Sequence, residues 1–235
     1  VTRVVLEGQR AVGVEFVRGK TVEVVSASAE VILASGAIGS PQILQLSGIG
    51  PGELLSRHGI GVVADSRQVG ENLQDHYVVG QNFRLKPGVP SVNALTHGPR
   101  FIGQAFEYLL FRTGLFAMSS AHVGIFCKSR PDLLRPDIQF HVMPATSRRP
   151  AHEGAKIDLD REPGLTLAPC QLRPESRGQI RIRSADPREH PLIAPNYLSA
   201  EEDARVIVAA LKWGRKIATL QPLRDLIAHE MKPGE

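Results

Sequence analysis

Cysteine is scarce in this chain of 235 residues, and its scarcity excludes two kinds of site. The two cysteines, Cys127 and Cys170, lie far apart in the sequence, and neither belongs to a CxxC motif. That motif is a usual signature of a metal site or a redox pair, so we expect no metal centre. Both residues stand in apolar stretches, where buried free thiols fit a reducing compartment. The sequence therefore predicts a cytoplasmic location.

Aromatic side chains and long apolar runs are also scarce. Aromatic residues make up 5% of the chain, and its 28 basic residues nearly balance its 24 acidic ones. A nucleic-acid interface usually needs a concentrated basic stripe with interleaved aromatics, so we expect no nucleic-acid partner. No apolar run approaches the ~20 residues that cross a bilayer, so we expect no transmembrane segment.

Two further absences are an initiator Met and a phosphate loop. The chain begins Val1-Thr2-Arg3-Val4, in the middle of a predicted strand. It contains no GxGxxG motif, the glycine-rich loop that binds dinucleotide phosphates. We therefore expect the chain to be an internal piece of a longer protein.

What the sequence does contain is centred on residues 29–50, AEVILASGAIGSPQILQLSGIG. The short apolar run at 31–34 predicts a strand buried on both faces, as in a parallel sheet. Ser35 and Gly36 follow, and their small side chains let a ligand approach the backbone. In open α/β sheets, dinucleotide phosphates bind where a strand leads through small residues into a helix. This stretch is therefore the candidate nucleotide site.

A helix is predicted directly after this strand. Ser40 is a suitable N-cap, Pro41 suits the first helical position, and Gly48 is a natural stop. The sequence of this segment, GAIGSPQILQLSGIG, resembles the second signature of the glucose–methanol–choline (GMC) flavin oxidoreductases. The matching positions are Gly36, Ala37, Ser40, Pro41, Ile43, Leu44, Ser47, Gly48, Ile49 and Gly50.

Three other stretches are similar to segments of the same family. VTRVVLEGQRAVGVEF, at residues 1–16, resembles the segment in which a strand passes the FAD adenine. VGENLQDH, at 69–76, resembles the segment that closes the FAD-binding part. PESRGQIRIRSADPREHPLIAPNYLS, at 174–199, resembles the start of the C-terminal segment. The resemblance covers essentially the whole chain and is loosest at 86–114.

The resemblance implies an α/β fold in two parts. Residues 1–76 would form part of an FAD-binding Rossmann-like domain that contains a β-meander. Residues 77–235 would form a substrate-binding domain, with an antiparallel sheet and flanking helices, and the start of the C-terminal GMC segment. The implied activity is FAD-dependent oxidation of a primary alcohol to the aldehyde by hydride transfer to flavin N5. The electron acceptor stays open.

The resemblance also implies which residues bind the cofactor. Val1 matches the position whose backbone contacts the FAD adenine in several members of the family. Ser35 and Gly36 belong to the candidate nucleotide site described above, and Asn72 belongs to the loop that the resemblance places near the cofactor. These four residues are the expected FAD contacts of this chain.

No residue of this chain is expected to be catalytic. The family's catalytic histidine and its partner are expected downstream of Glu235. The adjacent pair Asp75-His76 resembles a carboxylate that orients an imidazole, but adjacent side chains rarely face each other. We interpret it as a structural loop near the cofactor, held by local backbone bonds.

Substrate choice is expected to depend on the residue before Val123-Gly124-Ile125-Phe126. Choline-handling relatives place a glutamate where this chain has His122. An imidazole is a poor counterpart for a quaternary cation, so we expect a neutral primary alcohol as the substrate. The apolar side chains expected to line the same pocket are Phe116, Phe126, Phe140 and Val142.

Three other interpretations stay open. The first is a choline dehydrogenase proper, and the second is a non-catalytic fragment or binding module. The third is another Rossmann-type flavoprotein, such as a disulfide reductase. That class would need a CxxxxC redox pair, which the sequence lacks.

Periodicity predicts the remaining elements. Alternation and turn residues predict three strands before residue 27, and further strands at 77–85, 138–142, 165–168 and 179–183. Helical spacing predicts helices at 51–58 and 101–111, and a third that follows a capping box at 199–202 and ends before Pro222. The polar, aperiodic segment 145–163 predicts a mobile loop.

Overall fold

The computed structural model describes residues 1–148 and 158–234. The chain forms two compact units, one from Val1–Asp75 with Glu175–Ala200, and one from His76–Pro174 with Glu201–Glu235. The sequence analysis placed 175–200 in the second part, whereas the structure packs this segment into the first unit. The difference arises because strand β10 (Gln179–Arg181) pairs with β11 (Leu192–Ala194) and packs against the first helix of the chain.

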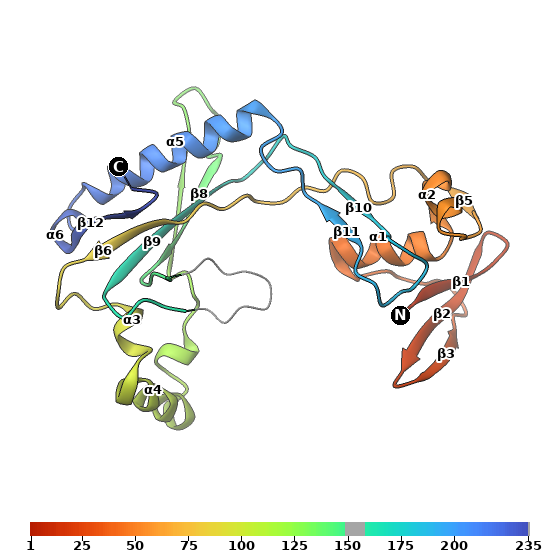
Figure 1. Ribbon diagram of the computed structural model, residues 1–235, viewed down its shortest axis with the longest axis horizontal. Helices are drawn as coiled ribbons and strands as arrows, with labels where there is room; N and C mark the ends of the chain where they lie inside the picture. The colour runs from red at the N-terminus through yellow and green to blue at the C-terminus, as the bar shows by residue number, and fades with distance from the viewer. Residues whose placement is uncertain (149–157, 235) are drawn as a thin grey trace. The chain divides into compact units, whose positions relative to one another are not determined.

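The first unit begins with the predicted meander of three strands (Figure 1). The strands are β1 (Arg3–Glu7), β2 (Arg10–Arg18) and β3 (Thr21–Ser26), and both pairings are antiparallel. Tight turns at Gly8 and Gly19 connect them, with φ of 60° and 63°, which glycine adopts without strain. The three strands predicted before residue 27 are therefore confirmed.

The segment that carries the GMC-like signature follows the meander in the sequence. Helix α1 (Gly36–Leu46) leads into the short strand β4 (Ile49–Gly50), which pairs in parallel with β5 (Ala64–Asp65). Helix α2 (Gly52–Arg57) lies between these two strands in the sequence, as predicted. Gly48 has φ of 83°, and a Cβ there would come within 2.4 Å of the Gly61 carbonyl oxygen, so only glycine fits at this stop.

Two expectations for this segment are wrong. Residues 31–34 form no strand, and Ile32 is 78% exposed, because no strand of the described chain pairs with this run. Helix α1 begins at Gly36 rather than near Ser40, and Pro41 lies inside it. The Ser40 hydroxyl accepts a hydrogen bond from the Ser35 backbone N–H at 3.1 Å, so this side chain supports the turn that starts the helix.

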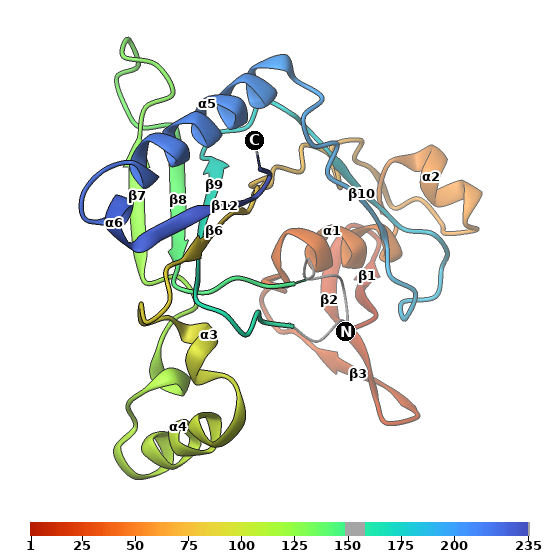
Figure 2. The same cartoon turned by 60° about the vertical axis from the view of Figure 1, so that its left-hand side comes forward.

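The second unit is built on an antiparallel sheet of five strands, in the order β12-β6-β9-β8-β7 (Figures 1 and 2). The predicted strands at 138–142 and 165–168 are confirmed, while the strand predicted at 77–85 begins only at Gln81. The strand bounds are β6 Gln81–Leu85, β7 Val123–Cys127, β8 Ile138–Met143, β9 Gly164–Gln171 and β12 Ile227–Lys232.

Helix α5 (Glu201–Ala218) lies across one face of this sheet (Figure 2). Alternate strand residues and one stripe of the helix meet there, because side chains repeat every two residues in a strand and about every 3.6 in a helix. Gly214 packs directly on the sheet, and a Cβ at this position would come within 2.0 Å of Gln81 Oε1. The buried core residues are Phe83, Leu85, Ile138, Phe140, Leu165, Leu167, Val206, Ala210 and Ala218.

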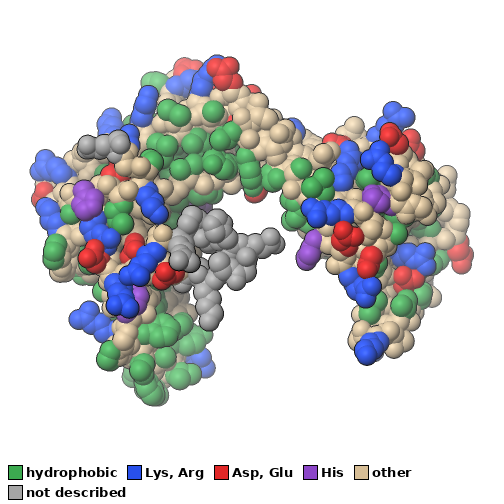
Figure 3. Space-filling view, in the orientation of Figure 1, with side chains coloured by type: hydrophobic (Ala, Val, Ile, Leu, Met, Phe, Trp, Pro, Cys, Tyr) green, Lys and Arg blue, Asp and Glu red, His purple; other side chains and the backbone are tan. Residues whose placement is uncertain are grey.

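The remaining helices flank the sheet at its ends. They are α3 (Val92–Leu95), α4 (Gly98–Phe111), the 3-10 turn η1 (Leu115–Ala117) and α6 (Leu223–Leu226). Hydrophobic side chains gather on the surface of α4 (Figure 3). The most exposed of them are Ile102, Phe106, Leu109, Leu110 and Phe111.

The segment 145–163 was expected to be a mobile loop. Residues 149–157 of this segment lie outside the described residues. The structure therefore describes only the two ends of the segment, 145–148 and 158–163. There the chain is paired, with hydrogen bonds from Arg148 N–H to the Asp158 carbonyl (2.9 Å) and from Asp160 N–H to the Thr146 carbonyl (2.9 Å). Within the described part of the chain, no helix is both long and apolar enough to cross a membrane.

Candidate functional site

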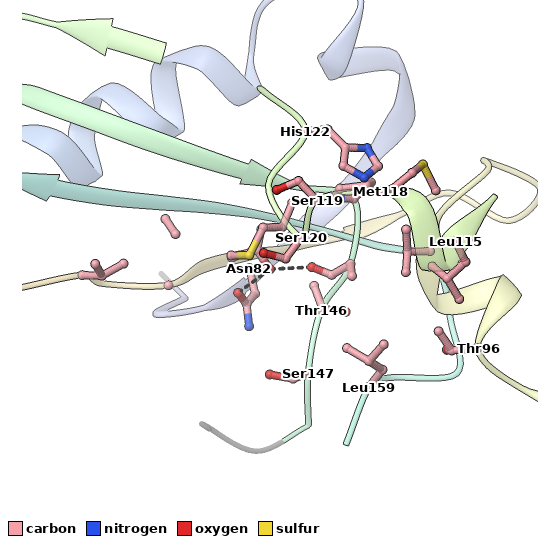
Figure 4. Close-up of a pocket in the computed structure, with 18 of the residues that line it drawn as sticks. Asn82, Thr96, Leu115, Met118, Ser119, Ser120, His122, Thr146, Ser147 and Leu159 are labelled. Carbon is pink, nitrogen blue, oxygen red and sulfur yellow. Dashed lines mark hydrogen bonds between the residues drawn. The ribbon is translucent and has the colours of Figure 1, made fainter. Parts of the chain in front are cut away.

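One candidate site of the second unit is a cavity of about 820 Å³ beside β6 and β9 (Figure 4). Its size falls in the range that small-molecule pockets occupy. Segments from η1 to His122 and from Met143 to Ser147 complete its wall. Hydroxyl, amide, imidazole and apolar groups line it, including Asn82, Met118, Ser119, Ser120, His122, Thr146 and Thr166.

A hydrogen-bonded pair fixes the polar part of this wall. Asn82 of β6 and Thr166 of β9 are neighbours in the sheet register. The Thr166 hydroxyl lies 2.6 Å from the Ala145 carbonyl oxygen and 3.1 Å from Asn82 Oδ1 (Figure 4). A hydroxyl has one proton to donate, and the shorter contact is the one to the Ala145 carbonyl, so Thr166 ties β9 to the segment at Ala145 and lies beside the Asn82 carboxamide.

Asn93 holds the segments that form one side of the cavity. Its side chain is fully buried, and its amide nitrogen donates to the carbonyls of Thr146 (2.8 Å) and Asp160 (3.0 Å). Its oxygen accepts a hydrogen bond from the Thr146 backbone N–H at 3.1 Å. A buried side chain with three such bonds fixes the backbone around it, so Asn93 positions Thr146 in the wall. No local sequence pattern marks this residue, because its partners lie 53 and 67 positions away.

His122, whose place in the substrate pocket stays a prediction, is among the residues that line this cavity. Its backbone N–H donates to the Val142 carbonyl at 3.0 Å, which anchors it at the start of β7 (Figure 4). Among the described residues that line the cavity, none is acidic, and the basic side chains are those of His122 and Lys232. The wall therefore supplies hydrogen-bonding groups without a carboxylate to neutralise a cation.

The phenylalanines expected in the pocket lie elsewhere. Phe140 is fully buried in the core on the α5 side of the sheet and does not line the cavity. Phe116 packs against Phe101 with the rings tilted by 57° and their centroids 5.5 Å apart, and Phe126 is exposed on β7. Alternation along β8 separates its two faces, and helix α5 covers the face that carries Phe140.

The residues expected to bind FAD all lie in the first unit. Val1 is exposed and precedes β1, while Ser35 and Gly36 lie at the start of α1. Gly36 has φ of 75°, and nothing lies within 4 Å of where its Cβ would be, so a ligand can come close to this backbone. Asn72 has φ of 61°, in a turn where Leu73 pairs with Gly178.

These features suit an anionic nucleotide. The first turn of α1 has no side-chain cap and carries no acidic residue. Backbone N–H groups at such a helix end attract a phosphate, since they carry partial positive charge and lack partners in the helix. The chemistry of this turn therefore fits the cofactor that the GMC resemblance implies.

Asp75 and His76 are each held by a different partner. The Tyr197 hydroxyl donates a hydrogen bond to Asp75 Oδ2. This bond, with burial and the negative charge of Asp75, raises the pKa of Tyr197 to about 12. The His76 ring nitrogen Nε2 lies 3.2 Å from the Leu172 carbonyl oxygen. These contacts tie Asp75 to Tyr197 and His76 to the backbone at Leu172, and the structural role of this loop stays a prediction.

Comparison with known proteins places this architecture in a family. Residues 1–78 match one family model described as GMC oxidoreductase, and residues 174–235 match a second with the same description. The chain belongs to the GMC oxidoreductase family. The predicted resemblance and the predicted α/β fold class are thereby confirmed.

Individual relatives of this GMC chain support the assignment. An alcohol dehydrogenase [acceptor] from Pseudomonas putida is 38% identical over 99% of this chain and 42% of its own length. An oxygen-dependent choline dehydrogenase from Pectobacterium atrosepticum is also 38% identical, over 99% of this chain and 40% of its own length. A formate oxidase structure from Aspergillus oryzae has a TM-score of 0.87 at 26% identity, over 100% of this chain and 45% of that one. The GMC chain thus spans less than half the length of these relatives.

Proposed function

We propose that this chain is part of an FAD-dependent oxidoreductase that oxidises a primary alcohol to the aldehyde. The observation that carries the proposal is the match of both GMC family models to the chain that also forms the cavity at Asn82 and His122. FAD, when bound, supplies the acceptor for the hydride that the alcohol carbon loses. The alcohol dehydrogenase relative from Pseudomonas putida supports the choice of substrate class.

In this proposal the chain's own residues bind and orient the two reactants. The start of α1, at Ser35 and Gly36, holds the cofactor together with Val1 and Asn72. In the second unit, Asn82 and the hydroxyls of Ser119 and Ser120 in the cavity wall offer hydrogen bonds to the alcohol group. A neutral hydroxyl needs such donors and acceptors and no counter-ion, which agrees with a wall without acidic side chains.

The experiment is expression from the complete reading frame. We expect a flavin absorption spectrum near unit stoichiometry, and aldehyde formation from primary alcohols with an artificial electron acceptor. The 235-residue chain expressed alone is the control, and we expect it neither to hold FAD tightly nor to oxidise alcohols. A complete protein without flavin, or one that holds flavin and oxidises no alcohol, contradicts the proposal.

Two further proposals concern alternatives and location. A choline dehydrogenase proper is the second candidate function, favoured by the choline dehydrogenase relative, and the carboxylate-free wall argues against it.

We also propose a cytoplasmic location, because Cys127 and Cys170 are free thiols. Burial raises the pKa of both thiols, which keeps them protonated and unreactive.

A further inference from the structure

A second cavity lies next to the candidate substrate pocket, within the same unit. It has a volume of about 640 Å³. Val92, His122 and Pro144 line both cavities, so the two spaces meet at these side chains. The imidazole of His122 has no hydrogen bond to any residue that the structure describes, and only its backbone is anchored. A side chain held in this way can change rotamer at little cost.

The wall of this second cavity is mainly apolar. Beyond the three shared residues, Val89, Ala94, Leu95 and Pro163 present carbon atoms to it. Ser91 is the exception, since it is 7% exposed and its hydroxyl has no hydrogen-bond partner among the described residues. The charged side chain in the wall is the exposed Arg100.

We propose that this second cavity receives the apolar tail of the alcohol substrate, whose hydroxyl binds in the first cavity and whose chain passes His122. The inference rests on the proposed function and narrows it to alcohols with an extended hydrocarbon chain. Each buried methylene improves binding roughly fourfold, so a tail that enters this space is favoured over a short alcohol. His122 would then make kcat/KM depend on the chain length of the alcohol. A short alcohol fits within the first cavity, whereas a long one must pass the imidazole ring to reach the second.

The test compares alcohols of different length in the complete protein. The measured quantity is the ratio of kcat/KM for 1-decanol to kcat/KM for 1-butanol. Ala94→Phe fills the second cavity, and we expect it to lower this ratio at least tenfold. Val208→Phe is the matched control, because it adds the same ring on the exposed face of α5 and lines neither cavity. It should leave the ratio unchanged.

A second measurement does not depend on turnover. 1-Decanol should raise the Tm of the wild-type protein and of Val208→Phe, and it should fail to do so for Ala94→Phe, since a bound ligand stabilises the folded state. His122→Ala widens the passage and should raise the decanol-to-butanol ratio. This variant also tests the inference if Ala94→Phe does not fold.

The outcomes separate the inference from the proposed function. If alcohols are oxidised but the ratio is the same in wild type, Ala94→Phe and His122→Ala, the second cavity takes no tail and the inference is overturned. If no alcohol is oxidised but 1-decanol stabilises wild type and not Ala94→Phe, the proposed function fails while the apolar site stands.

Discussion

Gln45 accepts a hydrogen bond from the backbone N–H of Ile182, 137 positions later in the chain, at 2.9 Å. The Gln45 side chain is fully buried in the first unit. Its amide nitrogen also donates to the carbonyls of Ile180 (3.0 Å) and Val69 (3.2 Å). A single carboxamide thus fastens the helix of the GMC signature to β10 and to the turn that carries Asn72.

Replacing Gln45 should destabilise the first unit strongly. In Gln45→Leu, the Ile182 N–H and the Ile180 carbonyl lose their partner without gaining access to water. We expect the free energy of unfolding of the complete protein to fall by about 2–4 kcal/mol, measured by urea unfolding. Gln42→Leu is the control, because Gln42 lies on the same helix and makes one exposed bond, to the Glu189 carbonyl. Equal losses in the two variants would contradict the role given to Gln45.

Gly214→Ala should destabilise the second unit. The new methyl group would lie within 2.0 Å of Gln81 Oε1, and Gln81 is fully buried. We expect a loss of about 1–3 kcal/mol, measured by thermal unfolding. Gly103→Ala on α4 should instead gain about 0.5–1 kcal/mol, because nothing lies within 4 Å of the added carbon. In a Gln81→Ala background the Gly214→Ala loss should shrink, since the obstructing atom is gone.

The Tyr197–Asp75 bond should give the stability of the protein a distinct dependence on alkaline pH. The folded pKa of Tyr197, about 12, lies above its ordinary value of 10.0. The bond therefore stabilises the fold fully below pH 10, and its contribution disappears as the pH rises through about 12. The difference in absorbance at 295 nm between wild type and Tyr197→Phe should titrate with a midpoint near 12. Asp75→Asn should lower that midpoint, whereas Asp186→Asn, at an exposed site, should leave it in place.

His122 should set the preference between neutral and cationic alcohols. We expect the wild-type protein to have a higher kcat/KM for benzyl or medium-chain alcohols than for choline. His122→Glu should shift the ratio toward choline by about tenfold to a hundredfold, because a desolvated cation gains a carboxylate partner. His229→Glu is the control, since His229 is exposed on β12 and outside the cavity wall. A wild type that prefers choline, or a ratio that His122→Glu leaves unmoved, removes His122 from the substrate pocket.

The run at 31–34 should become protected only in the complete protein. Ile32 is 78% exposed in this chain, whereas Val31 and Leu33 are half-buried. If strands from outside the chain cover this run, hydrogen exchange at these amides should be slow in the complete protein and fast in the isolated chain. Slow exchange in the isolated, monomeric chain would show that this run needs no outside partner. An apolar run with exposed side chains is also expected to make the isolated chain aggregate.

Sequence reasoning succeeded where neighbouring residues decide the structure. The meander from β1 to β3 depends on local alternation and on glycine turns at Gly8 and Gly19, and both can be read directly. The run at 31–34 was misjudged, because its burial depends on strands that this chain does not provide. The sequence pattern identifies an apolar segment, but it does not tell which strands will pair with that segment.

The candidate pocket also contains residues that the sequence could predict and residues that it could not. His122 was placed from a motif, and the structure puts it in a cavity wall. Phe140 was assigned to that wall, but a period of two does not tell which face of β8 a helix will cover. Asn93 was missed because its role depends on Thr146 and Asp160, and no local pattern connects them.

The pairing of β6 with β12 has a consequence for synthesis on the ribosome. Gln81 of β6 and Glu230 of β12 share a hydrogen bond across 149 positions of the chain. At the usual pace of translation, roughly 5–20 residues per second, the partner of β6 emerges on the order of ten seconds after β6 itself. During that interval the edge of β6 that pairs with β12 has no strand beside it, and Lys86, which directly follows β6, supplies a positive charge that discourages pairing with another nascent chain.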